Sequence, residues 1–173
     1  MATPVLCNTI TGIFKTCDTN RGSVTQILVA DQLSVTATTA NSANTLTGIT
    51  MYPGDTFVEV QFNRNAGNFD EVLARTEVSG ARIYDQKIAV TIPRRDIDKR
   101  NSIMVMGEGD RELFVIVKDG NDIFWAFPNQ ILTGVGGGSG AARKDGSTFT
   151  LEFTNESQSM AVDIDPTIIA ALY

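Results

Sequence analysis

The most apolar stretch of the chain predicts a central β-hairpin. From Leu113 to Phe127 the sequence reads LFVIVKDGNDIFWAF, two runs of branched and aromatic residues around an Asp-Gly-Asn-Asp cluster. Such residues favour a pleated, packed surface, and a Gly-Asn pair suits the positive φ of a tight primed turn. Both runs are apolar at nearly every position. We therefore expect both faces of the hairpin to be covered, one by the domain core and the other by a helix, a loop or another subunit.

Alternating apolar and polar positions elsewhere predict a mainly β fold. In 57–63, for example, Val58, Val60 and Phe62 are expected on the inner face. Gly, Pro, Asn and Asp turn signals separate the segments. The further predicted strands are 24–29, 33–35, 49–52, 57–63, 69–78, 82–92, 147–154 and 160–164. Residues 1–173 are expected to form one β-rich domain, an antiparallel β-sandwich or partly closed barrel.

One flanking helix is predicted over 94–106, which reads RRDIDKRNSIMVM. Ile97, Ile103 and Met104 approximate an apolar helical stripe, and glycine follows at the expected stop. Acidic residues near the start are stabilised by the positive end of the helix dipole. We expect this helix to lie on the sheet, where it could cover the second face of the central hairpin.

Three further segments lie outside the predicted hairpin and helix. Residues 36–48, TATTANSANTLTG, are small and uncharged, which favours a mobile surface loop that reaches a neighbouring subunit. Residues 134–146 are predicted to be a Gly-rich loop. Residues 166–173 form an apolar C-terminal tail, expected to dock on its own domain or on a partner. The candidate subunit-interface residues in these segments are Thr39, Asn41, Asn44, Ile168, Ile169, Leu172 and Tyr173.

The residue types argue against catalysis. The chain has no histidine, so Ser-His and Cys-His arrangements are excluded. The carboxylate pairs Asp96/Asp98 and Asp163/Asp165 are expected to be solvated. The glycine match that begins at Gly136 leads into a strand instead of the helix that a dinucleotide-binding loop needs. We predict no enzyme activity, no cofactor and no metal site.

The net charge of −6 argues against tight binding of nucleic acid, and residues 110–173 hold nine acids against four bases. Arg94, Arg95, Lys99 and Arg100 form the one basic cluster. It is either a solvated helix face or a set of inter-subunit salt-bridge partners for the acidic C-terminal third, and Arg94, Arg95 and Arg100 are therefore interface candidates.

Features of the N-terminal region and of the longest apolar runs predict where the protein is made. The N-terminal residues lack the pattern of a secretion signal, and no apolar run is long enough to cross a bilayer, so we expect synthesis in a cytoplasm without membrane insertion. Free thiols at Cys7 and Cys17 are then favoured over a disulfide.

Three segments together resemble structural proteins of tailed bacteriophages, most closely tail tube subunits. They are the opening DTNRGSVTQILVAD, the central FVIVKDGNDIFWAF, and SGAARKDGSTFTLEFTNESQSMAVDI near the end. The first departs from the family's Gly-Gly-Ile turn, because Gly22-Ser23-Val24 stands in that place.

The resemblance implies a virion protein assembled in the host bacterial cytoplasm. Tail tube subunits form hexameric rings that stack into a hollow conduit, through which DNA passes without specific binding. Partners would then be further copies of the chain and other virion proteins. A capsid decoration or auxiliary protein, or a head–tail connector ring subunit, is the alternative, and a carbohydrate- or protein-binding β-sandwich module is the third interpretation.

Overall fold

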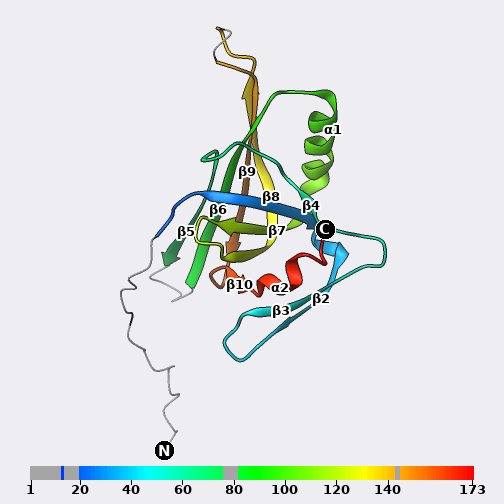
Figure 1. Cartoon of the computed structure of the whole chain (residues 1–173), viewed down its shortest axis with the longest axis vertical. Coiled ribbons are helices and arrows are strands. Elements are labelled where there is room, and N and C mark those ends of the chain that lie inside the picture. Colours follow the sequence, from blue (N-terminus) through cyan, green and yellow to red (C-terminus); the bar gives the residue numbers. More distant parts are fainter. Residues whose placement is uncertain (1–12, 14–19, 76–81, 143–144) are drawn as a thin grey trace, which may run out of the picture.

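The chain folds into a curled mixed β-sheet that forms a half-barrel, with one longer helix beside it (Figure 1). The computed structural model describes residues 13, 20–75, 82–142 and 145–173; Cys7 and Cys17, and therefore the prediction about their thiols, lie outside the described residues. The elements in chain order are β1 (Val24–Asp31), η1 (Gln32–Ser34), β2 (Val35–Ala40), β3 (Leu46–Met51), β4 (Val58–Glu59), β5 (Gly67–Arg75), β6 (Arg82–Pro93), α1 (Ile97–Met106), η2 (Glu108–Asp110), β7 (Glu112–Asp119), β8 (Phe124–Gly138), β9 (Thr148–Ser157), β10 (Val162–Ile164) and α2 (Pro166–Ile169).

The long strand β8 determines the curl of the sheet. Its first part pairs with β7 on one side and with β10 on the other, and its second part pairs with β9. Strand β9 pairs on its other side with β6, and β6 in turn pairs with β5. On the far side the order continues from β7 to β1 and β4. The prediction of a mainly β, partly closed barrel with one flanking helix is confirmed, and the parallel pairing of β10 with β3 makes the sheet mixed.

Two hydrophobic cores lie on opposite faces of the central hairpin. Val115 and Val117 of β7 join the core inside the half-barrel, whereas Phe114 and Ile116 join the second core. Strand β3, helix α2 and the C-terminal residues cover this second core. The prediction that both faces are covered is therefore confirmed. The helix expected to supply that cover, α1, instead inserts Ile103 into the first core.

The turn of the central hairpin differs from the expected two-residue primed turn. Four residues separate β7 from β8, and the residue with positive φ is Asp122 (φ 66°). The Asp119 carboxylate accepts hydrogen bonds from the backbone N–H groups of Asn121 (2.8 Å) and Ile123 (3.0 Å) and from Trp125 Nε1 (3.2 Å). An aspartate that bonds its own loop in this way stabilises a longer turn than the dipeptide suggests.

One predicted loop is largely strand, and a second is strand in its first part. Residues 36–48 form most of the β2–β3 hairpin, whose loop spans only 41–45. These threonine-rich strands show little apolar alternation. The ladder between β2 and β3 and the pairing of β3 with β10 hold them in place instead. In 134–146, residues up to Gly138 continue β8, because the β9 ladder satisfies the backbone groups of the glycines.

The predicted strand 57–63, by contrast, is mostly irregular, and only Val58–Glu59 forms a strand. Phe57 (2% exposed) packs edge-on against Phe114 in the second core, and Val60 (7%) packs in the first. Because the chain crosses from one core to the other here, strict alternation fails. Val58 is 54% exposed, so its predicted inward position is wrong.

Candidate assembly surface

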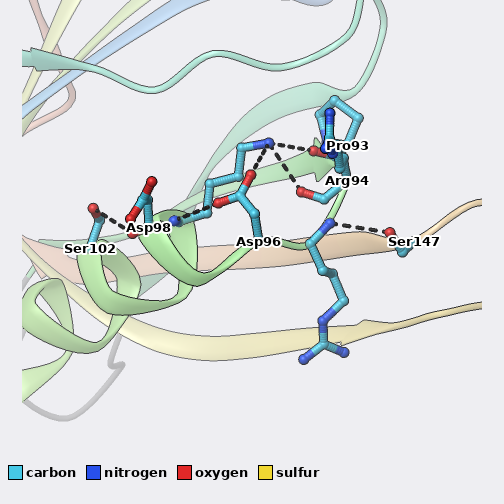
Figure 2. Close-up of polar contacts among 8 residues, drawn as sticks. Pro93, Arg94, Asp96, Asp98, Ser102 and Ser147 are labelled. Carbon is cyan, nitrogen blue, oxygen red and sulfur yellow. Dashed lines mark hydrogen bonds and ion pairs between the residues drawn. The ribbon is translucent and has the colours of Figure 1, made fainter.

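The corner between β6 and α1 is held by a dense set of hydrogen bonds (Figure 2). The Asp96 carboxylate caps the helix by accepting from the backbone N–H of Lys99 at 2.9 Å. The Lys99 ammonium lies 3.2 Å from Asp96 Oδ2 and donates to the carbonyl oxygens of Pro93 (2.9 Å) and Arg94 (3.0 Å). Ser147 fixes the corner to the start of β9, since its carbonyl oxygen accepts from the Arg94 N–H at 2.7 Å.

The electrostatics of this corner divide the predicted basic cluster. The Lys99 ammonium forms an ion pair with Asp96 inside the corner. The hydrogen bond from the backbone N–H of Lys99 is the main reason why the pKa of Asp96 lies below its ordinary value. The side chains of Arg94, Arg95 and Arg100 are exposed, and none takes part in the ion pairs between described residues. The Arg95 guanidinium lies over the Phe149 ring, 4.6 Å from its centroid. Three arginines therefore present positive charge to solvent beside α1.

Helix α1 exposes most of its apolar residues. Only Ile103 is buried, whereas Met104 is 58% and Val105 is 50% exposed. A groove of about 680 Å³ lies between the C-terminal half of α1 and Val135 of β8 (55% exposed). On the other flank, Val105 and Val58 line a groove of about 430 Å³. We call Met104, Val105, Val58 and Val135 the α1 patch.

A second exposed apolar region follows strand β5. Within the described residues β5 pairs only with β6, so its other edge has no strand partner. Val72 is 60% and Leu73 49% exposed on this strand. A long strand edge with exposed apolar side chains is a template for pairing with another chain. We call this region the β5 edge.

The structure distributes the predicted interface residues over three places. Thr39, Asn41 and Asn44 are exposed on the β2–β3 hairpin, and the Asn41 side chain is engaged in the loop, where it accepts from the backbone N–H groups of Ala43 and Thr45. The exposed Arg94, Arg95 and Arg100 lie at the α1 corner.

The C-terminal candidates lie on or beside α2. Ile169 and Leu172 are 4% and 5% exposed inside the second core, Ile168 is half-buried and Tyr173 is 55% exposed. The tail thus docks on its own domain, where the side chains of Ile169 and Leu172 are already buried in the second core.

The sequence interpretation missed the α1 patch and the β5 edge. The apolar helical stripe predicts that Met104 faces the sheet, and the pattern of the predicted strand 69–78 does not indicate which edge of the sheet this strand joins. Exposure of a helix or strand depends on its neighbours in the sheet order, and sequence alternation does not report that order.

The described ranges show neither a metal-binding cluster nor a membrane-spanning helix beside these surfaces. There, no group of three or more acidic or cysteine side chains is close enough to hold a metal ion. Within the same residues, no helix has both the length and the apolar character to cross a bilayer. Comparisons with protein families, curated proteins and solved structures found no significant match.

Proposed function

We propose that this chain is a structural virion protein, a tail tube subunit that self-assembles into stacked rings around a DNA conduit. The observation that carries the proposal is the presence of two different exposed apolar regions, the α1 patch and the β5 edge, on one subunit. A head-to-tail contact joins two unlike surfaces of identical chains, and such contacts close into rings when the rotation between copies closes. Six copies is the ring size that the family resemblance implies.

Projecting hairpins support stacking of such rings. The β8–β9 hairpin extends far beyond the body of the half-barrel, and the β2–β3 hairpin lies at the opposite end of the molecule (Figure 1). Strand β2 is exposed beyond its first residue, and β8 is exposed from Val135 to Gly138. Hairpins that project in this way offer contacts to copies above and below, and Val135 is the one residue that they share with the α1 patch or the β5 edge.

The charge of the chain supports a conduit. A net charge of −6 repels a polyanion, so DNA could move past the subunits without adhering. The exposed arginines of the α1 corner are three in number and lie beside an apolar patch, which favours inter-subunit ion pairs over a phosphate track.

The alternative, a capsid decoration protein or connector ring subunit, uses the same surfaces with a different symmetry. The third interpretation, a carbohydrate-binding module, needs an exposed aromatic platform. Among the described residues the exposed large aromatic side chains are Tyr52 and Tyr173, while the buried phenylalanines belong to the two cores. This distribution favours the assembly interpretations.

The decisive measurement is electron microscopy with light scattering over a concentration series. Tubes or sixfold rings are expected for the wild type. The variants Met104→Glu/Val105→Glu and Val72→Lys/Leu73→Lys should each raise the concentration needed for half-assembly by about tenfold or more, because each places charge in a buried contact. Leu33→Glu, at a residue 89% exposed outside both regions, is the matched control and should assemble like the wild type.

Other outcomes separate the alternatives. Trimers or rings of another symmetry would support the decoration or connector interpretations. A monomer at every concentration would contradict self-assembly and favour a binding module. If both charged variants assembled as well as the wild type, the proposed contact surfaces would be wrong even where rings form.

A further inference from the structure

A pocket lined by two arginines opens at the end of the half-barrel where β1 begins. Its volume is about 630 Å³, which is within the range of small-molecule sites. Arg21 and Ser23 come from the segment that enters β1, and Phe62, Arg64 and Asn65 come from the turn that precedes β5. Gly120 of the β7–β8 turn closes one side.

The pocket is positively charged in a protein of net negative charge. Arg21 and Arg64 line it, and among the described residues no aspartate or glutamate does. None of the ion pairs between described residues includes Arg21 or Arg64. The pKa of Asp122 is lowered mainly by its hydrogen bond from Lys118, and the charge of Arg21 contributes less. Among the described residues, no ion pair therefore neutralises either arginine.

The pocket walls are held in place by close packing and hydrogen bonds. The Arg21 N–H donates to Asn121 Oδ1 at 2.7 Å, and the Gly120 N–H donates to the Ser23 carbonyl oxygen at 2.9 Å. A Cβ at position 120 would lie 2.5 Å from the Gly22 carbonyl oxygen, so the two segments touch through backbone alone. A rigid wall fixes the entry angle of the Arg21 side chain and lowers the entropy lost when a ligand binds.

Unusual backbone geometry occurs on two walls of the same pocket. Ser23 (φ 78°) and Asn65 (φ 63°) are both in the left-handed region, which non-glycine residues adopt rarely. Such conformations cost free energy and are concentrated at ligand-binding segments. Phe62, which is partly buried against the first core, adds a flat apolar wall beside the arginines.

We propose that this pocket binds a phosphate monoester with an organic body, of the nucleoside monophosphate class. Arg21 and Arg64 contact the phosphate oxygens, since planar guanidinium groups match phosphate geometry. Phe62 packs against the ring of the organic body, and the volume beyond the arginines accommodates that ring. The site lies outside the α1 patch and the β5 edge, so its occupancy is independent of the proposed assembly contacts.

Isothermal titration calorimetry of the full chain at low ionic strength tests the proposal. The titrants are a nucleoside monophosphate, inorganic phosphate and the uncharged nucleoside. We expect saturable binding of the monophosphate at one site per chain, weaker binding of inorganic phosphate and no binding of the nucleoside. Arg21→Gln and Arg64→Gln should each weaken monophosphate binding about tenfold or more, because each removes a charge-assisted contact.

Arg82→Gln is the matched control, since Arg82 is an exposed arginine on β6 that does not line the pocket. It should bind like the wild type, and thermal melting of all three variants checks that the fold is kept. Absence of saturable binding, or an equal loss in Arg82→Gln, would overturn the site. Equal affinity for inorganic phosphate and the monophosphate would overturn the role of Phe62.

Discussion

At the scale of single residues, a short chain of two buried glutamines and the half-buried Glu71 links three strands. Gln130 of β8 donates through Nε2 to Gln86 Oε1 at 3.0 Å, and Gln86 Nε2 donates to Glu71 Oε1 at 2.9 Å. Glu71 also accepts from the Ala161 N–H at 2.7 Å, just before β10. Gln130 Oε1 has no partner among the described residues. Buried polar groups such as these favour one register, because a slipped strand would leave them unpaired.

Substitution of one glutamine should therefore cost more than substitution of both. Gln86→Leu leaves both polar ends of the Gln130 amide without a partner, so we expect the free energy of unfolding to fall by about 2 kcal/mol. Adding Gln130→Leu should recover much of this loss, because no unpaired amide then remains in the core. Urea unfolding of the two singles and the double measures the coupling. A double variant less stable than Gln86→Leu would contradict this account.

At the scale of elements, α1 is held mainly by its start. Ile103 is its one buried side chain, so packing gives the helix little support. The Asp96 cap and the Lys99 contacts with Pro93 and Arg94 compensate by satisfying backbone groups at the corner. A helix anchored in this way stays exposed along its length, which keeps the α1 patch available for a partner.

The cap makes the helix sensitive to acid. The folded-state pKa of Asp96 lies below the ordinary value of 3.8, mainly because its carboxylate accepts from the Lys99 N–H. The stabilisation is therefore present above the ordinary pKa and is lost as pH falls through the lowered value. Asp96→Asn keeps a capping oxygen but does not titrate. We expect this variant to have a lower melting temperature than the wild type near neutral pH. The difference in melting temperature should disappear in acid.

Circular dichroism melting of both proteins from about pH 6 to about pH 3 checks this expectation. Asp122 and Asp165 also have lowered pKa values, from hydrogen bonds with Lys118 and Thr167 respectively. Their effects are common to both proteins and cancel in the difference. Parallel melting curves across the whole range would show that the charge of Asp96 does not contribute.

At the scale of the whole molecule, the C-terminal residues complete the second core. Leu172 is 5% exposed, and its carbonyl oxygen accepts from the Phe57 N–H at 2.8 Å. Its side chain belongs to the same cluster as Phe114 and Ile116 of the central hairpin. Residues at the end of the chain thus close the outer face of a strand that lies in the middle of the sheet.

Leu172→Ala should lower the free energy of unfolding by about 2–4 kcal/mol, because it opens a cavity in the second core. Tyr173→Ala, at the exposed neighbouring position, is the matched control and should change the free energy by about 0.5 kcal/mol or less. Urea unfolding of the unassembled protein measures both. Equal and small effects would indicate that the tail is not docked in solution and is instead available to a neighbouring subunit.

The sequence by itself determined the local elements that have strong patterns. The two-sided apolar runs of 113–127 required a hairpin covered on both faces, and the alternation in 82–92 and 147–154 placed strands β6 and β9 correctly. The apolar stripe, the acidic residues near its start and the following glycine located α1 to within a few residues. These features depend on interactions between near neighbours, which is why the residue pattern alone predicts them.

Only the tertiary structure decided which surfaces remain exposed. The α1 patch, the β5 edge and the arginine pocket arise from the order of strands in the sheet and from the curl at β8. The β2–β3 hairpin and the glycine end of β8 are strands because their ladders satisfy the backbone, although their side chains carry little apolar signal. Contacts between residues far apart in the chain are set by packing of the whole sheet, and local alternation does not encode them.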